Sequence, residues 1–160
     1  EVNGVKNETA EAAKIKHLNP SFIDAEQDIV AAVDYLFEKY NRPITILGSS
    51  YSASLALKIA VDNSKISSVI VFSPGEYFDD KKYIANHIQK LNKPIFATSS
   101  RDEADSVTDL LKDVNSRIKI QYIPSSKGDH GSKVLWPEST SNQEYWIAIM
   151  SFLNRIKTTE

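Results

Sequence analysis

The sequence contains no cysteine, which excludes disulfide bonds, a thiolate nucleophile and cysteine-ligated metal sites. It has no apolar run long enough to cross a bilayer, and its first residues show no charged-then-apolar signal pattern. Neither sign of charge dominates, because 19 basic and 21 acidic residues give a formal net charge of −2. This balance argues against a nucleic-acid-binding or anionic-membrane-binding surface. We therefore expect no membrane span and no nucleic-acid partner, and the composition leaves the compartment open.

The length of 160 residues fits one domain, and hydrophobic residues make up 41% of the chain, which is enough for a substantial core. Residues 1–21 are polar and irregular in pattern, and we interpret them as a leader. Apolar periodicity begins after Asn19-Pro20-Ser21, so we assign residues 22–160 to a single folded domain.

Short apolar segments alternate with segments of helical periodicity along this domain. Strands are predicted at 44–47, 66–72, 94–98 and 118–123, and helices at 21–40, 51–61, 81–91, 103–114 and 142–156. Uninterrupted apolar strands separated by helices are typical of a parallel sheet that is covered on both faces. The sequence therefore predicts an α/β fold with three α/β/α layers and a mostly parallel sheet.

The segment 44–56 reads ITILGSSYSASLA and predicts a strand, a tight turn and a helix with Ser50 at the turn. In a nucleophile elbow, such a turn exposes a serine hydroxyl above the carboxyl ends of the strands. The residues two before and two after the serine must be small, and Gly48 and Ser52 meet that requirement. The N–H of Tyr51, at the start of the helix, is the expected first donor to an oxyanion. The alternative is that these serines only cap the helix.

A candidate acid follows the predicted strand 94–98. Asp102 lies in the loop at the carboxyl end of this strand, and we predict that it is the acid of a catalytic triad. Glu103, Asp105 and Asp129 are competing carboxylates. Asp102 is preferred because it comes most directly off the strand, although it could instead cap the following helix.

The candidate base is His130, which lies in a glycine-flanked loop after the predicted strand 118–123. The carboxyl ends of parallel strands meet at one edge of a sheet, so Ser50, Asp102 and His130 are expected to converge there. The other two histidines, His17 in the leader and His87 on a helix, are interpreted as solvated or half-buried residues.

The motifs Gly48-Ser49-Ser50-Tyr51-Ser52-Ala53, Arg101-Asp102-Glu103 and Gly128-Asp129-His130-Gly131 resemble the α/β-hydrolase superfamily, especially its dienelactone-hydrolase-like serine esterases. The resemblance covers residues 22–157 and implies an esterase in which Ser50 attacks, His130 is the general base and Asp102 orients it. It implies a small-molecule ester substrate and no cofactor or metal. The family usually has glycine where this chain has Ser52, and dienelactone hydrolases proper use a cysteine nucleophile, which favours simple carboxylic esters here.

The same resemblance predicts that the N-terminal strands of the family fold are missing, because the first 20 residues carry no convincing strand. The family takes its second oxyanion donor from that region, so a preceding segment or a second chain is expected to complete the sheet and the site. Two other functions remain open at this point. One is a non-catalytic α/β-hydrolase-like binding module, and the other is a flavodoxin-like domain, for which no glycine-rich phosphate loop or acidic metal cluster is present.

Overall fold

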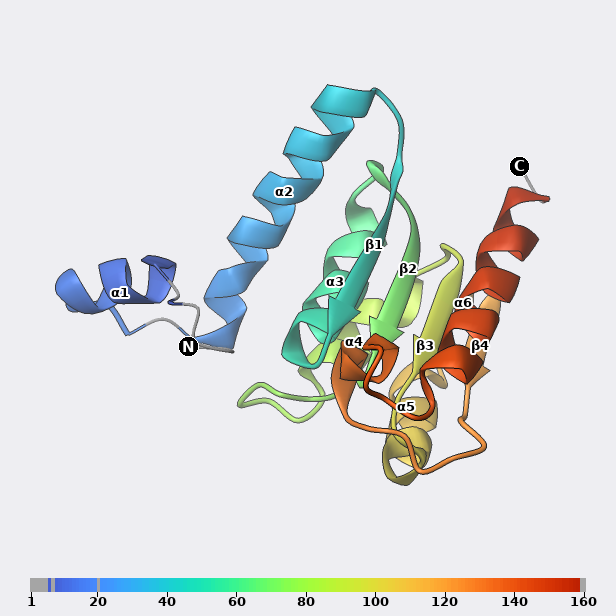
Figure 1. The fold of residues 1–160 in the computed structure, drawn as a ribbon. Helices are drawn as coiled ribbons and strands as arrows, with labels where there is room; N and C mark the ends of the chain where they lie inside the picture. The colour runs from blue at the N-terminus through green and yellow to red at the C-terminus, as the bar shows by residue number, and fades with distance from the viewer. Residues whose placement is uncertain (1–5, 7, 20, 159–160) are drawn as a thin grey trace.

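The computed structural model describes residues 6, 8–19 and 21–158 (Figure 1). Its strands are β1 (Ile44–Ser49), β2 (Ile66–Phe72), β3 (Ile95–Thr98) and β4 (Lys119–Tyr122). Its helices are α1 (Glu8–Ile15), α2 (Ala25–Tyr40), α3 (Tyr51–Asp62), α4 (Tyr83–His87), α5 (Ala104–Leu111) and α6 (Asn142–Lys157). Short 3-10 turns cover Phe22–Asp24, Ile88–Lys90, Arg101–Glu103 and Gly131–Leu135.

The four strands form one parallel sheet in the order β1-β2-β3-β4. β1, which leads into Ser50, lies at one side of this sheet and β4 at the other, as the sequence predicted. The last residues of the strands pair in register: Ser49 with Phe72, Phe72 with Thr98, and Thr98 with Tyr122. All four carboxyl ends therefore meet at a common edge.

Helices cover both faces of the sheet, and β2 shows how the core is divided between them. Val69 and Val71 pack into a cluster with α3, α4 and α5, whereas Ile70 and Phe72 pack into a second cluster with α6. Successive side chains of a strand point to opposite faces, so one apolar strand serves two cores. Figure 1 shows α3 and α6 on opposite sides of the strands. The predicted three-layer α/β/α fold is confirmed.

α3 is the most deeply buried helix next to the site. Seven of its residues are buried: Ala53, Ser54, Leu55, Ala56, Leu57, Ile59 and Ala60. Small residues at its N-terminal end allow it to pack closely against β1 and β2. This packing holds the start of the helix at the carboxyl edge of the sheet.

The structure differs from the sequence-based expectation mainly in the leader. Residues 8–15 form α1, although the leader was expected to be irregular. Its charges favour a helix, because Glu8 and Glu11 lie in the first turn and Lys14 in the last, with Lys14 Nζ 2.9 Å from Glu11 Oε1. Residues 1–5, 7 and 20 of the leader lie outside the described residues. The helix expected over 81–91 is divided into α4 and a 3-10 turn.

Candidate active site

Ser50 lies in a strained turn between β1 and α3. Its backbone has φ 58° and ψ −133°, a conformation that costs a non-glycine residue about 1–3 kcal/mol. Two hydrogen bonds hold it there: Ser50 N–H donates to the Phe72 carbonyl at 2.8 Å, and Ala53 N–H donates to the Ser50 carbonyl at 2.9 Å. The rest of the sheet therefore imposes this turn, which raises the Ser50 side chain at the end of the strands.

The small residues around Ser50 are required by close backbone packing. A Cβ atom on Gly48 would lie 2.6 Å from the Cα of Ala53 and 2.7 Å from the carbonyl oxygen of Ser52, which leaves no room for a side chain. Ser52 replaces the usual glycine with a hydroxyl that bonds back to the turn. It donates to the Ser49 carbonyl at 2.7 Å and accepts from the Ser49 N–H at 3.2 Å.

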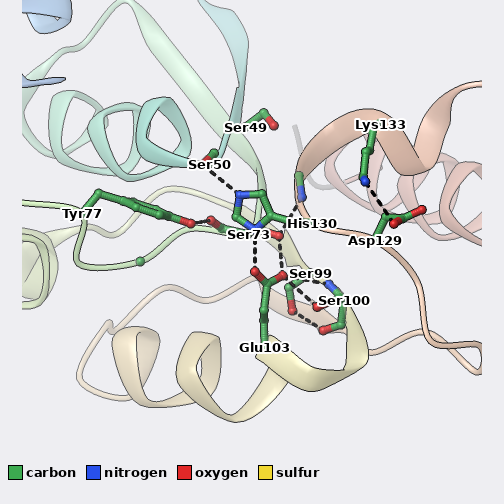
Figure 2. A network of polar contacts seen from close by, with 12 residues as sticks. Ser49, Ser50, Ser73, Tyr77, Ser99, Ser100, Glu103, Asp129, His130 and Lys133 are labelled. Atoms are coloured by element: carbon green, nitrogen blue, oxygen red, sulfur yellow. Dashed lines mark hydrogen bonds and ion pairs between the residues drawn. The ribbon is translucent and has the colours of Figure 1, made fainter.

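His130 connects Ser50 to a carboxylate. Its Nε2 lies 2.9 Å from Ser50 Oγ, and its Nδ1 lies 2.5 Å from Oε1 of Glu103 (Figure 2). The His130 side chain is 47% exposed and that of Glu103 is 32% exposed, so the site is open to solvent. The structure thus brings Ser50 and His130 together, as the sequence predicted.

The predicted contact between Asp102 and His130 is wrong, because Glu103 takes that place. Both residues belong to the 3-10 turn after β3, but Asp102 is exposed. Ser100 and Glu103 form a capping box, in which the glutamate side chain turns back toward the backbone at the start of the helical segment. That start lies at the carboxyl edge of the sheet, so the capping interaction directs Glu103, rather than Asp102, toward His130.

Asp129, Asp105 and His87, also considered from the sequence, lie apart from the contacts among Ser50, His130 and Glu103. Asp129 forms an ion pair with Lys133 at 3.1 Å, and Figure 2 shows this pair apart from Glu103. Asp105 is exposed on α5. The Nδ1 of His87 lies 2.6 Å from the Tyr83 carbonyl oxygen, within its own helix.

The Glu103 carboxylate is held by four groups. Oε2 accepts hydrogen bonds from Ser73 Oγ at 2.7 Å, Ser100 Oγ at 2.9 Å and Ser100 N–H at 3.1 Å, which leaves Oε1 for His130. Burial raises the pKa of this carboxyl, but the hydrogen bonds from His130, Ser73 and Ser100 outweigh burial, and the net pKa is lowered. Glu103 is therefore ionised at neutral pH and suited to face a protonated imidazole.

The loop that carries His130 is tied to the acid-bearing turn by Arg101. Its guanidinium donates to the backbone carbonyls of Pro124 at 2.8 Å, of Ser126 at 3.3 Å and of Ser125. The Arg101 N–H also donates to the Lys127 carbonyl at 2.9 Å. One residue thus fixes the distance between the turn with Glu103 and the loop with His130.

Glu144 of α6 holds the same loop from its other side. Its carboxylate accepts from the hydroxyls of Tyr122 at 2.8 Å, Ser125 at 2.7 Å and Ser126 at 2.5 Å. Burial raises the pKa of Glu144, but these hydrogen bonds outweigh it and lower the pKa to about 2. Burial and the contact with Glu144 raise the pKa of Tyr122 to about 12.

Sequence reasoning missed two residues of the site, Ser73 and Tyr77, and ranked Glu103 behind Asp102. Ser73, just after β2, bonds to Glu103 and accepts from Gly131 N–H at 2.9 Å. Tyr77 donates its hydroxyl to the Ser73 carbonyl at 2.7 Å and lies edge-on to the His130 ring. The pattern Ser-x-x-Glu at 100–103 is a capping-box signature and could have identified Glu103. No local pattern marks Ser73 or Tyr77.

The start of α3 lies directly after Ser50. Tyr51 is the first residue of α3, where N–H groups lack partners within the helix, so its expected role as an oxyanion donor is carried forward as a proposal. No group of three or more His, Asp or Glu side chains suited to a metal occurs among the described residues. No helix in the described ranges is long and apolar enough to cross a membrane.

Comparison with known proteins gives structural similarities only. No protein-family model matches the sequence, and no curated protein matches it. The esterase Pf2001 of Pyrococcus furiosus aligns with a TM-score of 0.70 and 17% identity over 86% of this chain and 64% of its own. The esterase domain of a Rhodothermus marinus protein aligns with a TM-score of 0.62 and 12% identity, over 79% of this chain and 67% of its own.

A Klebsiella pneumoniae protein assigned as a dienelactone hydrolase aligns with a TM-score of 0.60 and 11% identity, over 82% of this chain and 60% of its own. The chain therefore spans roughly three fifths to two thirds of the length of these proteins. At such low identity the similarity establishes the fold and not the activity. This chain therefore has the α/β-hydrolase type of fold that these solved structures share.

Proposed function

We propose that this chain is a serine hydrolase that cleaves carboxylic esters through an acyl-enzyme intermediate. Ser50 is the nucleophile, His130 the general base and Glu103 the acid that orients His130. The observation that carries the proposal is the continuous line of contacts from Ser50 Oγ through His130 to Glu103, at 2.9 and 2.5 Å. It starts on a strained elbow, which is the setting of the nucleophile in this fold.

The first half of the reaction forms the acyl-enzyme. Ser50 Oγ attacks the ester carbonyl carbon while its proton passes to Nε2 of His130. The carbonyl oxygen becomes an oxyanion, toward which the Tyr51 N–H donates. Glu103 remains ionised and stabilises the imidazolium of His130 through Nδ1. When the tetrahedral intermediate collapses, the bond to the alcohol oxygen breaks and His130 gives its proton to the departing alcohol.

The second half releases the acid. A water molecule takes the place of the alcohol, gives a proton to His130 and attacks the acyl carbon of the Ser50 ester. Collapse of the second intermediate returns the proton to Ser50 Oγ and frees the carboxylic acid. No cofactor or metal enters this sequence of steps.

The rate of such a site depends on a second oxyanion donor besides the Tyr51 N–H. Removing one oxyanion donor from a serine protease lowers kcat by about 10²–10³-fold. The second donor is proposed to come from a segment before residue 1 or from a second chain, and either lies outside the residues that the structure describes. This consideration supports the alternative function, a non-catalytic binding module that retains the elbow.

Labelling and turnover together discriminate the two functions. A fluorophosphonate should label the native chain at Ser50, and Ser50→Ala and His130→Ala should abolish both labelling and p-nitrophenyl acetate hydrolysis. Ser106→Ala, which removes an exposed hydroxyl on α5, is the control and should behave as the native chain. Hydrolysis rates that are equal in the native chain and in Ser50→Ala would contradict the esterase and favour the binding module.

A further inference from the structure

Half of the residues that line a hollow next to the triad are aromatic. Its volume is about 540 Å³, within the range of small-molecule sites. The lining residues are Ser21, Phe22, Ile23, Tyr77, Phe78, Asp79, Asp80 and Tyr83. They come from the 3-10 turn before α2 with its N-cap Ser21, and from the loop between β2 and α4 with the first residue of α4, two segments far apart in the sequence.

Tyr77 connects this hollow to the nucleophile. Its hydroxyl donates to the Ser73 carbonyl at 2.7 Å, and its ring centroid lies 6.4 Å from that of His130 at an interplanar angle of 77°. Burial is the largest influence on the pKa of the Tyr77 phenol, which is raised. Figure 2 shows the Tyr77 ring reaching from its loop toward His130 and Ser73. Tyr77 therefore borders both the hollow and the His130 ring.

Phe22 makes a second connection between the hollow and the elbow, through the residue that follows Ser50. Its ring stacks on Tyr51, the residue after the nucleophile, with centroids 4.4 Å apart and an interplanar angle of 15°. Even with this contact, Phe22 is 52% exposed and Ile23 is 38% exposed. Large apolar side chains exposed together beside a reactive serine indicate a ligand surface.

We propose, building on the esterase function above, that this hollow binds an uncharged aryl or medium-length alkyl group of the ester substrate. The group belongs either to the acyl part or to the alcohol part, since both project from the same carbonyl. The aromatic side chains provide flat apolar walls for such a group. Phe22 and Phe78 are the specificity-determining residues.

The charges at the hollow select against anionic substrates. Asp79 and Asp80 are the charged residues in its lining, and both are exposed carboxylates. Lys81 and Lys82 follow them in the sequence, and Lys81 Nζ donates to the Phe78 carbonyl at 2.9 Å. The lining itself presents carboxylates, so a substrate that carries its own carboxylate is repelled there.

The first test measures kcat/KM for p-nitrophenyl esters, each divided by its rate of hydrolysis by hydroxide. We expect this normalised kcat/KM to be higher for the phenylacetate and hexanoate esters than for the acetate ester. The ratio should be about 10-fold or more, the scale expected for several buried methylene groups. Phe22→Ala and Phe78→Ala should each lower this ratio several-fold. Tyr35→Ala removes an exposed aromatic ring of α2 outside the hollow and should keep the native ratio.

Two further series distinguish the acyl part from the alcohol part and test the charge. Benzyl acetate compared with ethyl acetate measures an alcohol-side preference, while the p-nitrophenyl series measures an acyl-side preference. The p-nitrophenyl monoester of glutaric acid should be a poorer substrate than p-nitrophenyl hexanoate. The double variant Asp79→Asn, Asp80→Asn should reduce the difference in kcat/KM between these two esters. An unchanged difference would contradict the charge argument.

A binding measurement separates this inference from the esterase function. Saturation-transfer NMR on Ser50→Ala should detect binding of 2-phenylethanol and, more weakly, of the phenylacetate anion. Both signals should be lost when Phe78→Ala is added to Ser50→Ala. Binding without Ser50-dependent hydrolysis by the native chain would overturn the esterase and keep the apolar site. Ser50-dependent hydrolysis with ratios near one in every series, unchanged by Phe22→Ala and Phe78→Ala, would overturn the inference and keep the esterase.

Discussion

Glu103, and not its neighbour Asp102, contacts His130, with Oε1 2.5 Å from Nδ1. The two carboxylates are adjacent in the same 3-10 turn, yet one points into the site and the other is exposed to solvent. The capping interaction of Glu103 with Ser100 and its bond from Ser73 account for this difference.

Exchanging the two carboxylates for amides tests the identity of the acid. Glu103→Gln should lower kcat for p-nitrophenyl acetate by about 10³–10⁴-fold, because an amide neither stabilises the imidazolium nor selects the correct tautomer. Asp102→Asn is the matched control and should stay within about twofold of the native rate. The opposite result, with Asp102→Asn inactive and Glu103→Gln active, would restore Asp102 as the acid.

Gly48→Ala tests the tight packing of the elbow. The added Cβ meets backbone atoms of Ser52 and Ala53 at 2.6–2.9 Å, so strand and helix must move apart. We expect a loss of about 1–3 kcal/mol in the free energy of unfolding, together with reduced labelling of Ser50 by a fluorophosphonate. Gly75→Ala is the control in urea unfolding, since its nearest contact would be the Tyr77 ring at an ordinary 3.4 Å. Equal stability of the two variants would show that the elbow is looser than described.

Arg101→Lys tests whether the spacing of the two loops matters. The guanidinium reaches several carbonyls of residues 124–126 at once, and an ammonium group cannot reproduce this planar set of donors. We expect kcat to fall about 10-fold or more with a smaller change in Tm, because His130 loses its alignment with Ser50. Arg117→Lys, at an exposed position before β4, should leave kcat and Tm unchanged. A kcat equal to that of the native chain in Arg101→Lys would contradict this positioning role.

Glu144 should make the stability of the protein depend on pH in the acid range. Its pKa is about 2 in the folded chain, below the ordinary value of 4.5, so ionised Glu144 favours the folded state. This contribution is complete above about pH 4.5 and is lost as the pH falls toward 2. Urea unfolding of the native chain should therefore show a steeper loss between pH 5 and about pH 3 than Glu144→Gln.

The control for this pH dependence is Glu138→Gln, which alters an exposed carboxylate in the segment before α6. It should retain the native slope. If Glu144→Gln also retains that slope, the hydrogen bonds from Tyr122, Ser125 and Ser126 do not stabilise the ionised carboxylate as described.

The sequence alone determined the layers of the fold and two members of the site. The alternation of apolar strands with amphipathic helices requires a covered parallel sheet, because apolar strands such as Ile66–Phe72 must bury both faces. Gly48, Ser50 and Ser52 around a strand end are a local pattern with a local steric cause. His130 was identifiable because the chain has only three histidines and one of them follows a strand.

The capping-box pattern at 100–103 favours Glu103 locally, but the tertiary structure decided between Asp102 and Glu103, since the contact with His130 also depends on Ser73, which lies far away in the sequence. It also decided that Tyr77 lies edge-on to His130 and that Phe22 stacks on Tyr51. These contacts join segments that no periodicity links. Hydrophobic patterning specifies which face of an element is buried, whereas the side chains that meet at the end of a sheet are set by register, turn geometry and packing between distant segments.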